Sequence, residues 1–494
     1  MLKATRYIFI LSLGILLILA SCGSKDDANK DNIPADGDNS QETTLNPLWG
    51  DSPIPATVNM NGRVVRVFNA STGSSFMLEE APGEVVGDAQ YKRNKIVEDK
   101  LNVKFQHLFA PEGVDANTSL MNTIQADLAD YDIATHYQWD AVRLVTAGAY
   151  RDIGDLPYVD INDPWWATFY CEEMKIGNDR MFFYAGDWHY NTLNNQSAMF
   201  VNKKLYTNEI GDPNDLYQIV MDGKWTFDKY TDTVREMWKD LDGDGRKTAA
   251  DQYGTAVTYP TITNHLTFAA GIKFSERDEN GLPRMIITSE QNITFTEKMT
   301  GLYFKNDGCR CIDSSTDPDA IQTISNMFAD DRLLIYVGRF WNTSGEWMRN
   351  MNTDYMIIPY PKYDESMPQY YSLVGDSCPL LCVPTTSTLD DSLVGAIFTE
   401  LAYQAHEHMI PAYFEVALKG KYTRDTNDVA FEILDMIRAG ATTDFAFIYN
   451  DALEGIGAFM HSLMRERTKI VSAYSKVENA VDAALQSLIS AYLD

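Results

Sequence analysis

Residues 63–75 read RVVRVFNASTGSS, an apolar run that passes directly into a loop of small polar residues. Its β-branched residues predict a strand over 63–69, followed by a loop over 71–75. The chain then alternates between helix-like and strand-like segments, which fall at 89–101, 103–108, 117–128 and 131–135. Strand, helix, strand, helix and strand at this spacing predict parallel pairing in an α/β fold.

Two loops are candidate parts of a binding site. Ligands of open parallel sheets bind beyond the carboxyl ends of the strands, and this rule selects residues 71–75 and 136–140. Within these loops we predict that Ser74, Trp139 and Asp140 contact a ligand.

Five further segments carry a resemblance when they are taken in order. They are residues 131–153, 198–205 (AMFVNKKL), 223–228 (GKWTFD), 333–341 (LLIYVGRFW) and 355–361 (YMIIPYP). Together they resemble the bacterial extracellular solute-binding proteins of family 1, the carbohydrate-binding lipoproteins of ABC importers. The resemblance covers nearly all of residues 60–494.

The resemblance implies a two-lobed, periplasmic-binding-protein-like fold of type II, with a hinge and a ligand cleft between the lobes. Lobe one would comprise residues 60–195 and 384–424, and lobe two residues 196–383 and 425–494. The chain would cross between the lobes near Asn195, Val383 and Arg424. Apolar residues at helical spacing over 391–408 predict a helix that docks on lobe one.

Aromatic residues near the expected cleft suit a sugar, because pyranose C–H faces stack on rings while hydroxyls need polar partners. Trp341 ends a strand at the position where the family has a ligand-facing tryptophan, and Asn194, Asp376 and Tyr449 complete the predicted ligand-binding set. The alternative is packing, since tryptophan and tyrosine are commonly buried in cores.

Residues 240–251, DLDGDGRKTAAD, resemble a calcium-binding loop. Asp240, Asp242 and Asp244 occupy alternate positions, the carbonyl of Arg246 can add an oxygen, and Asp251 stands where such loops usually carry glutamate. We predict a structural calcium ion in lobe two; a solvated acidic turn is the alternative.

The N-terminal segment predicts export. Lys3 and Arg6 precede an apolar run that ends in Leu-Ala-Ser-Cys at residues 19–22, which resembles a lipobox. We predict a signal peptide over 1–21, lipidation of Cys22, and a flexible polar tether over 22–59. The protein would then be lipid-anchored on the extracytoplasmic face of the cell membrane.

Charge and cysteine content restrict the partners. The 70 acidic and 41 basic residues give a net charge of −29, which disfavours nucleic acid as a partner.

Five cysteines follow Cys22, an odd number without zinc-site spacing, and we predict that they are mostly buried and unpaired. A link between Cys309 and Cys311 stays open.

The sequence lacks the G-x-S-x-G and G-x-x-x-x-G-K motifs, and we predict no enzyme. The predicted function is that of a monomeric ABC-importer lipoprotein that captures an oligosaccharide by hinge closure and delivers it to a membrane permease. Two alternatives remain: a binding protein that serves a sensor, and a lipoprotein glycoside hydrolase, which would need a pair of carboxylates across the cleft.

Overall fold

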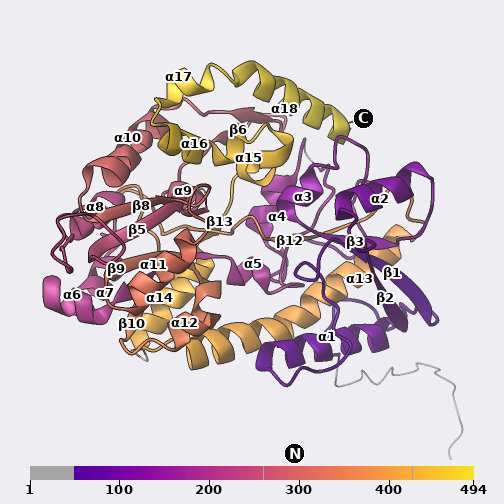
Figure 1. The fold of residues 1–494 in the computed structure, drawn as a ribbon. Helices are drawn as coiled ribbons and strands as arrows, with labels where there is room; N and C mark the ends of the chain where they lie inside the picture. The colour runs from indigo at the N-terminus through magenta and orange to yellow at the C-terminus, as the bar shows by residue number, and fades with distance from the viewer. Residues whose placement is uncertain (1–48, 178, 260, 426, 494) are drawn as a thin grey trace, which may run out of the picture. The chain divides into compact units, whose positions relative to one another are not determined.

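The computed structural model describes residues 49–177, 179–259, 261–425 and 427–493 (Figure 1). These residues belong to one unit, Leu45–Asp494, which contains two main β-sheets and two short strand pairs. The predicted signal peptide, Cys22 and the first part of the predicted tether lie outside the described residues. Within the described part of the chain, no helix is both long enough and apolar enough to span a bilayer.

The first sheet has the strand order β12-β3-β1-β2. Its strands are β1 (Arg63–Asn69), β2 (Val103–Phe109), β3 (Ile133–Tyr137) and β12 (Pro379–Cys382). The first three are parallel, with Val67 opposite Ile133, and β12 is antiparallel to β3. The predicted strands and their parallel pairing are confirmed, and so are the helices between them, α1 (Val85–Leu101) and α2 (Ala116–Gln125).

The second sheet has the order β10-β4-β9-β5-β8. Its strands are β4 (Ser197–Asn202), β5 (Tyr253–Tyr259), β8 (Cys309–Asp313), β9 (Leu333–Arg339) and β10 (Tyr355–Ile358). Strands β9, β5 and β8 are parallel, and β4 is antiparallel to both β9 and β10. Two short pairs accompany the sheets: β6 (Ser275–Arg277) with β7 (Pro283–Met285), and β11 (Ser372–Leu373) with β13 (Ala441–Thr442).

Side-chain caps begin many of the helices. Asp115, Asn202, Asp390 and Asp444 each accept a hydrogen bond from a backbone N–H in the first turn of the helix that follows. The helices beyond α2 are α3 (Gln138–Val142), α4 (Thr168–Met174), α5 (Asn191–Asn194), α6 (Lys203–Glu209), α7 (Pro213–Met221), α8 (Phe227–Val234), α9 (Thr261–Ala269), α10 (Glu290–Lys305), α11 (Ala320–Ala329), α12 (Glu346–Arg349), α13 (Asp391–Gln404), α14 (Asp428–Ala439), α15 (Phe445–Ile448), α16 (Phe459–Glu466), α17 (Ile470–Tyr474) and α18 (Glu478–Leu493).

Short 3₁₀ and π segments complete the structure. The 3₁₀ segments are η1 (Phe340–Ser344), η4 (Asn450–Ala452) and η5 (Ile456–Ala458), and the π segments are η2 (Ala405–Met409) and η3 (Ala412–Tyr422). Helix α13 and both π segments pack along α1 (Figure 1), as predicted for residues 391–408.

Two predicted segment boundaries need correction. Strand β12 pairs with β3, so the chain has already returned to the first sheet at Pro379, before the predicted boundary at residue 384. The C-terminal helix also contacts residues that were assigned to lobe one, because the rings of Tyr492 and Phe182 lie 4.3 Å apart. Residues 425–494 therefore do not belong wholly with the second sheet.

The predicted tether is also shorter than expected. Ile54 is only 1% exposed, and the indole of Trp49 donates a hydrogen bond to Asp99 at 3.1 Å. Gln404 donates to the Trp49 carbonyl, and Ser52 donates to Glu400. Residues 49–55 thus pack on α1 and α13, because burial of these side chains offsets the entropy cost of ordering the segment.

Candidate functional site

Two segments that connect the sheets run side by side. The Gly375 N–H donates to the Asn195 carbonyl at 3.1 Å, and the Asn195 side chain donates to the Ser377 carbonyl at 3.0 Å. The Phe340 N–H, just beyond β9, donates to the Gln196 carbonyl at 3.0 Å. These bonds bring together three predicted site residues that are distant in sequence, Asn194, Trp341 and Asp376.

Arg339 lies at the centre of this junction. Its Nη1 is 3.7 Å from Oδ1 of Asp376, and its guanidinium carbon is 5.6 Å from the centre of the Trp341 ring. Trp341 is 41% exposed, a large value for a tryptophan. An exposed ring beside a guanidinium and a carboxylate can stack on a ligand and hydrogen-bond to it.

A glycine holds the crossing segment against Arg339. A Cβ at Gly375 would lie 2.7 Å from Nη1 of Arg339 and 3.4 Å from the His265 ring. The His265 imidazole is neutral at ordinary pH, because burial and the nearby Arg339 charge lower its pKa well below the usual value. The absence of a side chain at residue 375 therefore allows the close approach.

A small hollow of about 60 Å³ adjoins Trp341 at the carboxyl ends of β5 and β9. Apolar side chains of Ile262, Ile321 and Ile324 line it, together with Arg339 and Asn342. The hollow occupies the edge of the second sheet at which ligands of α/β folds bind.

On the first sheet, the predicted residues differ in how accessible they are. Ser74 is fully buried, and its N–H and hydroxyl both hydrogen-bond to Ser71, so it shapes the loop after β1. The indole N–H of Trp139 donates to the Phe447 carbonyl at 2.9 Å, and the partly buried ring packs against that of Phe447, with 5.7 Å between the ring centres. Asp140 is half-exposed, 3.7 Å from Arg143. Burial raises the pKa of Asp140, while Arg143 opposes this rise.

Backbone contacts join this group to the junction, because the Gln138 N–H donates to the Cys378 carbonyl at 3.0 Å. Asn194 is partly buried, and it accepts a hydrogen bond from the hydroxyl of Tyr413 at 2.8 Å. Tyr449 does not join the group: it is fully buried, and its hydroxyl bonds to the Met174 carbonyl and to Tyr492. The predicted place of Tyr449 near the cleft is therefore corrected to a place in the core.

Comparison with known proteins gives a fold assignment. No protein-family model matches the sequence, and no curated protein matches it. Among solved structures, UspC from M. tuberculosis aligns with a TM-score of 0.54 and 12% identity, over 85% of this chain and 100% of that chain. UgpB from Mycobacterium tuberculosis, in complex with glycerophosphocholine, gives 0.52 and 13% over 86% and 99%. The ABC substrate-binding protein Lmo0181 from Listeria monocytogenes, in complex with cycloalternan, gives 0.51 and 12% over 86% and 99%.

The chain has the two-lobed fold of the ABC substrate-binding proteins. The predicted type II fold is thereby confirmed. Asn195 and Gly375, which hydrogen-bond to each other, lie on the two segments that connect the first sheet with the second.

Sequence reasoning missed Arg339 and Tyr413. Arg339 ends the same strand that presents Trp341, and this position was the only local signal available. Tyr413 lies on η3, and its contact with Asn194 depends on tertiary packing that no short motif encodes.

Three carboxylates of the acidic loop lie close together. Carboxylate oxygens of Asp240, Asp242 and Asp244 lie within 4.8 Å of one another, and all three residues are exposed. The pKa of Asp242 is raised: the hydrogen bond from the Asp244 N–H lowers it, but burial and the neighbouring carboxylates outweigh that bond. Asp251 is turned to the backbone and accepts hydrogen bonds from Leu241 and Thr248. The carbonyl of Arg246 remains a predicted ligand.

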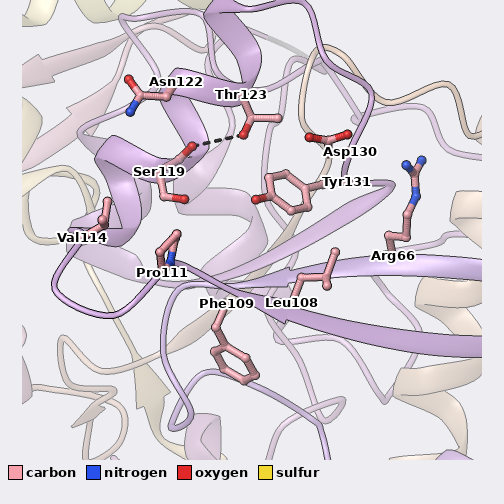
Figure 2. A pocket seen from close by; sticks show the side chains of 10 residues that line it. All are labelled: Arg66, Leu108, Phe109, Pro111, Val114, Ser119, Asn122, Thr123, Asp130 and Tyr131. Atoms are coloured by element: carbon pink, nitrogen blue, oxygen red, sulfur yellow. Dashed lines mark hydrogen bonds between the residues drawn. The ribbon is translucent and has the colours of Figure 1, made fainter.

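A wider hollow of about 590 Å³ lies away from the junction, between β2 and α2 (Figure 2). Its lining residues come from β1, β2, α2 and the segment before β3, all of which belong to the first sheet and its neighbours. Arg66 at its rim is held by Asp132, 3.1 Å away. A ligand clamped between two lobes would not occupy this hollow.

The five described cysteines are free. Cys171, Cys378 and Cys382 are buried, as predicted, whereas Cys309 and Cys311 are partly buried and side by side on β8. The structure contains no link between the last two.

Proposed function

We propose that this protein is the substrate-binding component of an ABC importer and that its ligand is an oligosaccharide or a related carbohydrate. The observation that supports this most directly is the group formed by Arg339, Trp341 and Asp376 at the junction of the lobes. An exposed aromatic ring flanked by a charged donor and a charged acceptor provides both kinds of contact that a sugar ring requires.

Binding proceeds by closure of the lobes about the crossing segments, and the closed form is the one that a permease recognises. Support comes from the fold, which is shared with Lmo0181 bound to cycloalternan, and from the backbone hydrogen bonds between the segments that connect the two sheets. Binding, without chemical conversion of the ligand, is the proposed activity. The protein acts as a monomer.

A test is isothermal titration of the protein, without its first 48 residues, against a panel of neutral oligosaccharides. A Trp341→Ala variant should bind at least tenfold more weakly, because a stacked aromatic contact contributes about 1–3 kcal/mol. Tyr158→Ala is the matched control, since Tyr158 is 42% exposed and lies elsewhere on the chain. Failure of every panel member to bind a folded sample would refute the carbohydrate proposal.

We also propose that Cys22 carries a lipid that anchors the protein on the extracytoplasmic face of the membrane. The support is the lipobox-like sequence at 19–22 and the polar segment that follows it. In cells fed an alkynyl fatty acid, Cys22→Ser should abolish labelling and release the protein from the membrane fraction. Ser24→Ala should do neither.

The acidic loop is proposed to hold a structural calcium ion through Asp240, Asp242 and Asp244, with the Arg246 carbonyl as a further ligand. Asp251 would join them only by giving up its hydrogen bonds from Leu241 and Thr248. Calcium should raise the melting temperature of the protein, and Asp242→Asn should abolish the rise. Asp232→Asn, on the exposed end of α8, is the control. An equal rise in both variants would show that calcium acts elsewhere.

A further inference from the structure

We infer that Arg339 and Asp376 together bind adjacent hydroxyl groups and make the site select uncharged glycans over anionic ones. The inference rests on the proposed carbohydrate-binding function and narrows its ligand class. It assigns Asp376 as a specificity-determining residue and Arg339 as a ligand-binding residue.

The two side chains are close, but they leave hydrogen-bonding capacity unused. Nη1 of Arg339 and Oδ1 of Asp376 are 3.7 Å apart, which is longer than a hydrogen bond. This Nη1 is buried and forms no hydrogen bond with any residue that the structure describes. Among the described residues, Oδ1 of Asp376 accepts only a long bond of 3.4 Å from the Ser377 hydroxyl.

This geometry fits a vicinal diol. One hydroxyl oxygen can accept from the guanidinium while its neighbour donates to the carboxylate, so both unused groups are satisfied at once. The ring that carries the diol would then lie near Trp341, whose centre is 5.6 Å from the Arg339 guanidinium carbon. Neither an apolar ligand nor a lone anion would satisfy both groups.

The charge balance opposes an anionic ligand. Any ligand carboxylate that reached Arg339 would also lie within a few ångströms of Asp376, and repulsion at that range is strong in a partly buried site. His265 adds no compensating charge, because its buried imidazole is neutral. Near Trp139, Arg143 is shared by Asp140 and Asp451, so its charge is already balanced by two carboxylates.

The test uses matched trisaccharides that differ only at C6: cellotriose with triglucuronate, mannotriose with trimannuronate, and galactotriose with trigalacturonate. Titration calorimetry of the folded protein should show at least one neutral member binding at least tenfold more tightly than its uronate. Asp376→Asn keeps the shape of the side chain but removes its charge, and it should reduce that ratio to about threefold or less. Arg339→Met should weaken the neutral ligand at least tenfold.

Matched controls are Asp232→Asn and Arg235→Met, an exposed ion pair on lobe two that should leave the ratio unchanged. Circular dichroism and thermal unfolding establish that each variant is folded. Tighter binding of a uronate, or an unchanged ratio in folded Asp376→Asn, would overturn this inference and leave the proposed function intact. Absence of binding by all six glycans would instead overturn the proposed function, and this inference with it.

Discussion

Gly375→Ala should weaken ligand binding while leaving the fold intact. The new methyl group would lie 2.7 Å from Nη1 of Arg339 and 3.4 Å from the His265 ring. Relief of the closer contact requires Arg339 to move by roughly 0.7 Å, because ordinary carbon contacts begin near 3.4 Å. Such a displacement changes the position of the guanidinium relative to Asp376 and Trp341.

The expected cost in stability is small. Overpacking a filled site lowers the free energy of unfolding by about 1–3 kcal/mol. Replacing glycine also restricts the unfolded chain, which raises the free energy of unfolding by about 0.4–1 kcal/mol. The free energy of unfolding should therefore fall by about 0–2.5 kcal/mol. Ligand affinity should fall more, by at least tenfold, because a misplaced donor loses its charge-assisted hydrogen bond.

The assay pairs urea unfolding with titration of the best-binding neutral trisaccharide. Gly301→Ala is the control, since nothing lies within 4 Å of the added Cβ in helix α10, and there alanine should stabilise by about 0.5–1 kcal/mol. Ligand affinity within twofold of the unchanged protein in a folded Gly375→Ala variant would refute the link between residue 375 and Arg339.

Two further predictions concern stability. Ile54→Ala should lower the free energy of unfolding by about 2 kcal/mol in a urea titration, because Ile54 is 1% exposed in the docked segment 49–55. Val64→Ala is the control: Val64 is 50% exposed, and its loss should change the free energy of unfolding by less than about 0.5 kcal/mol. His406 lies 2.7 Å from Asp187, and its pKa is raised by that hydrogen bond, against the effect of burial. A raised folded-state pKa stabilises the protein below the unfolded value near 6.5, and this contribution is lost as pH rises through the folded pKa. His406→Gln should therefore cost more stability at pH 6 than at pH 9, and equal costs at the two pH values would contradict a protonated His406.

Local pattern was sufficient for the strands and helices of the first sheet. Val65 and Val67 alternate with exposed Val64, so the period of residues 63–69 is visible in the sequence alone. The same reasoning failed at residues 49–55, where Trp49 and Ile54 stand among polar residues and average composition indicates a loose segment. Their docking depends on α1 and α13, which meet only in the folded protein.

The site was partly predictable for a related reason. Trp341 could be recognised because its strand and the aromatic residue that follows form one continuous pattern. The pairing of Arg339 with Asp376 could not, since it is created by the bond between Gly375 and Asn195 on two separate crossing segments. Tyr449 was misplaced because its position depends on tertiary contacts that no local spacing reveals. Helix α15, which precedes Tyr449, packs against α4, and the Tyr449 hydroxyl donates to the Met174 carbonyl.

The position of the candidate site has a mechanistic consequence. Asp376 lies between Gly375 and Ser377, and both of these neighbours hydrogen-bond to Asn195 across the crossing. A ligand held by Asp376 and Trp341 therefore acts on the same few residues through which the lobes would move. A ligand can shift a conformational equilibrium only by its difference in affinity for the two states. In the proposed mechanism, ligand contacts at the crossing supply this difference in affinity directly, because closure changes the distances between Asp376 and the residues on the first sheet. Substitutions at Gly375 should accordingly alter affinity and closure together, whereas substitutions at the hollow beside α2 should alter neither.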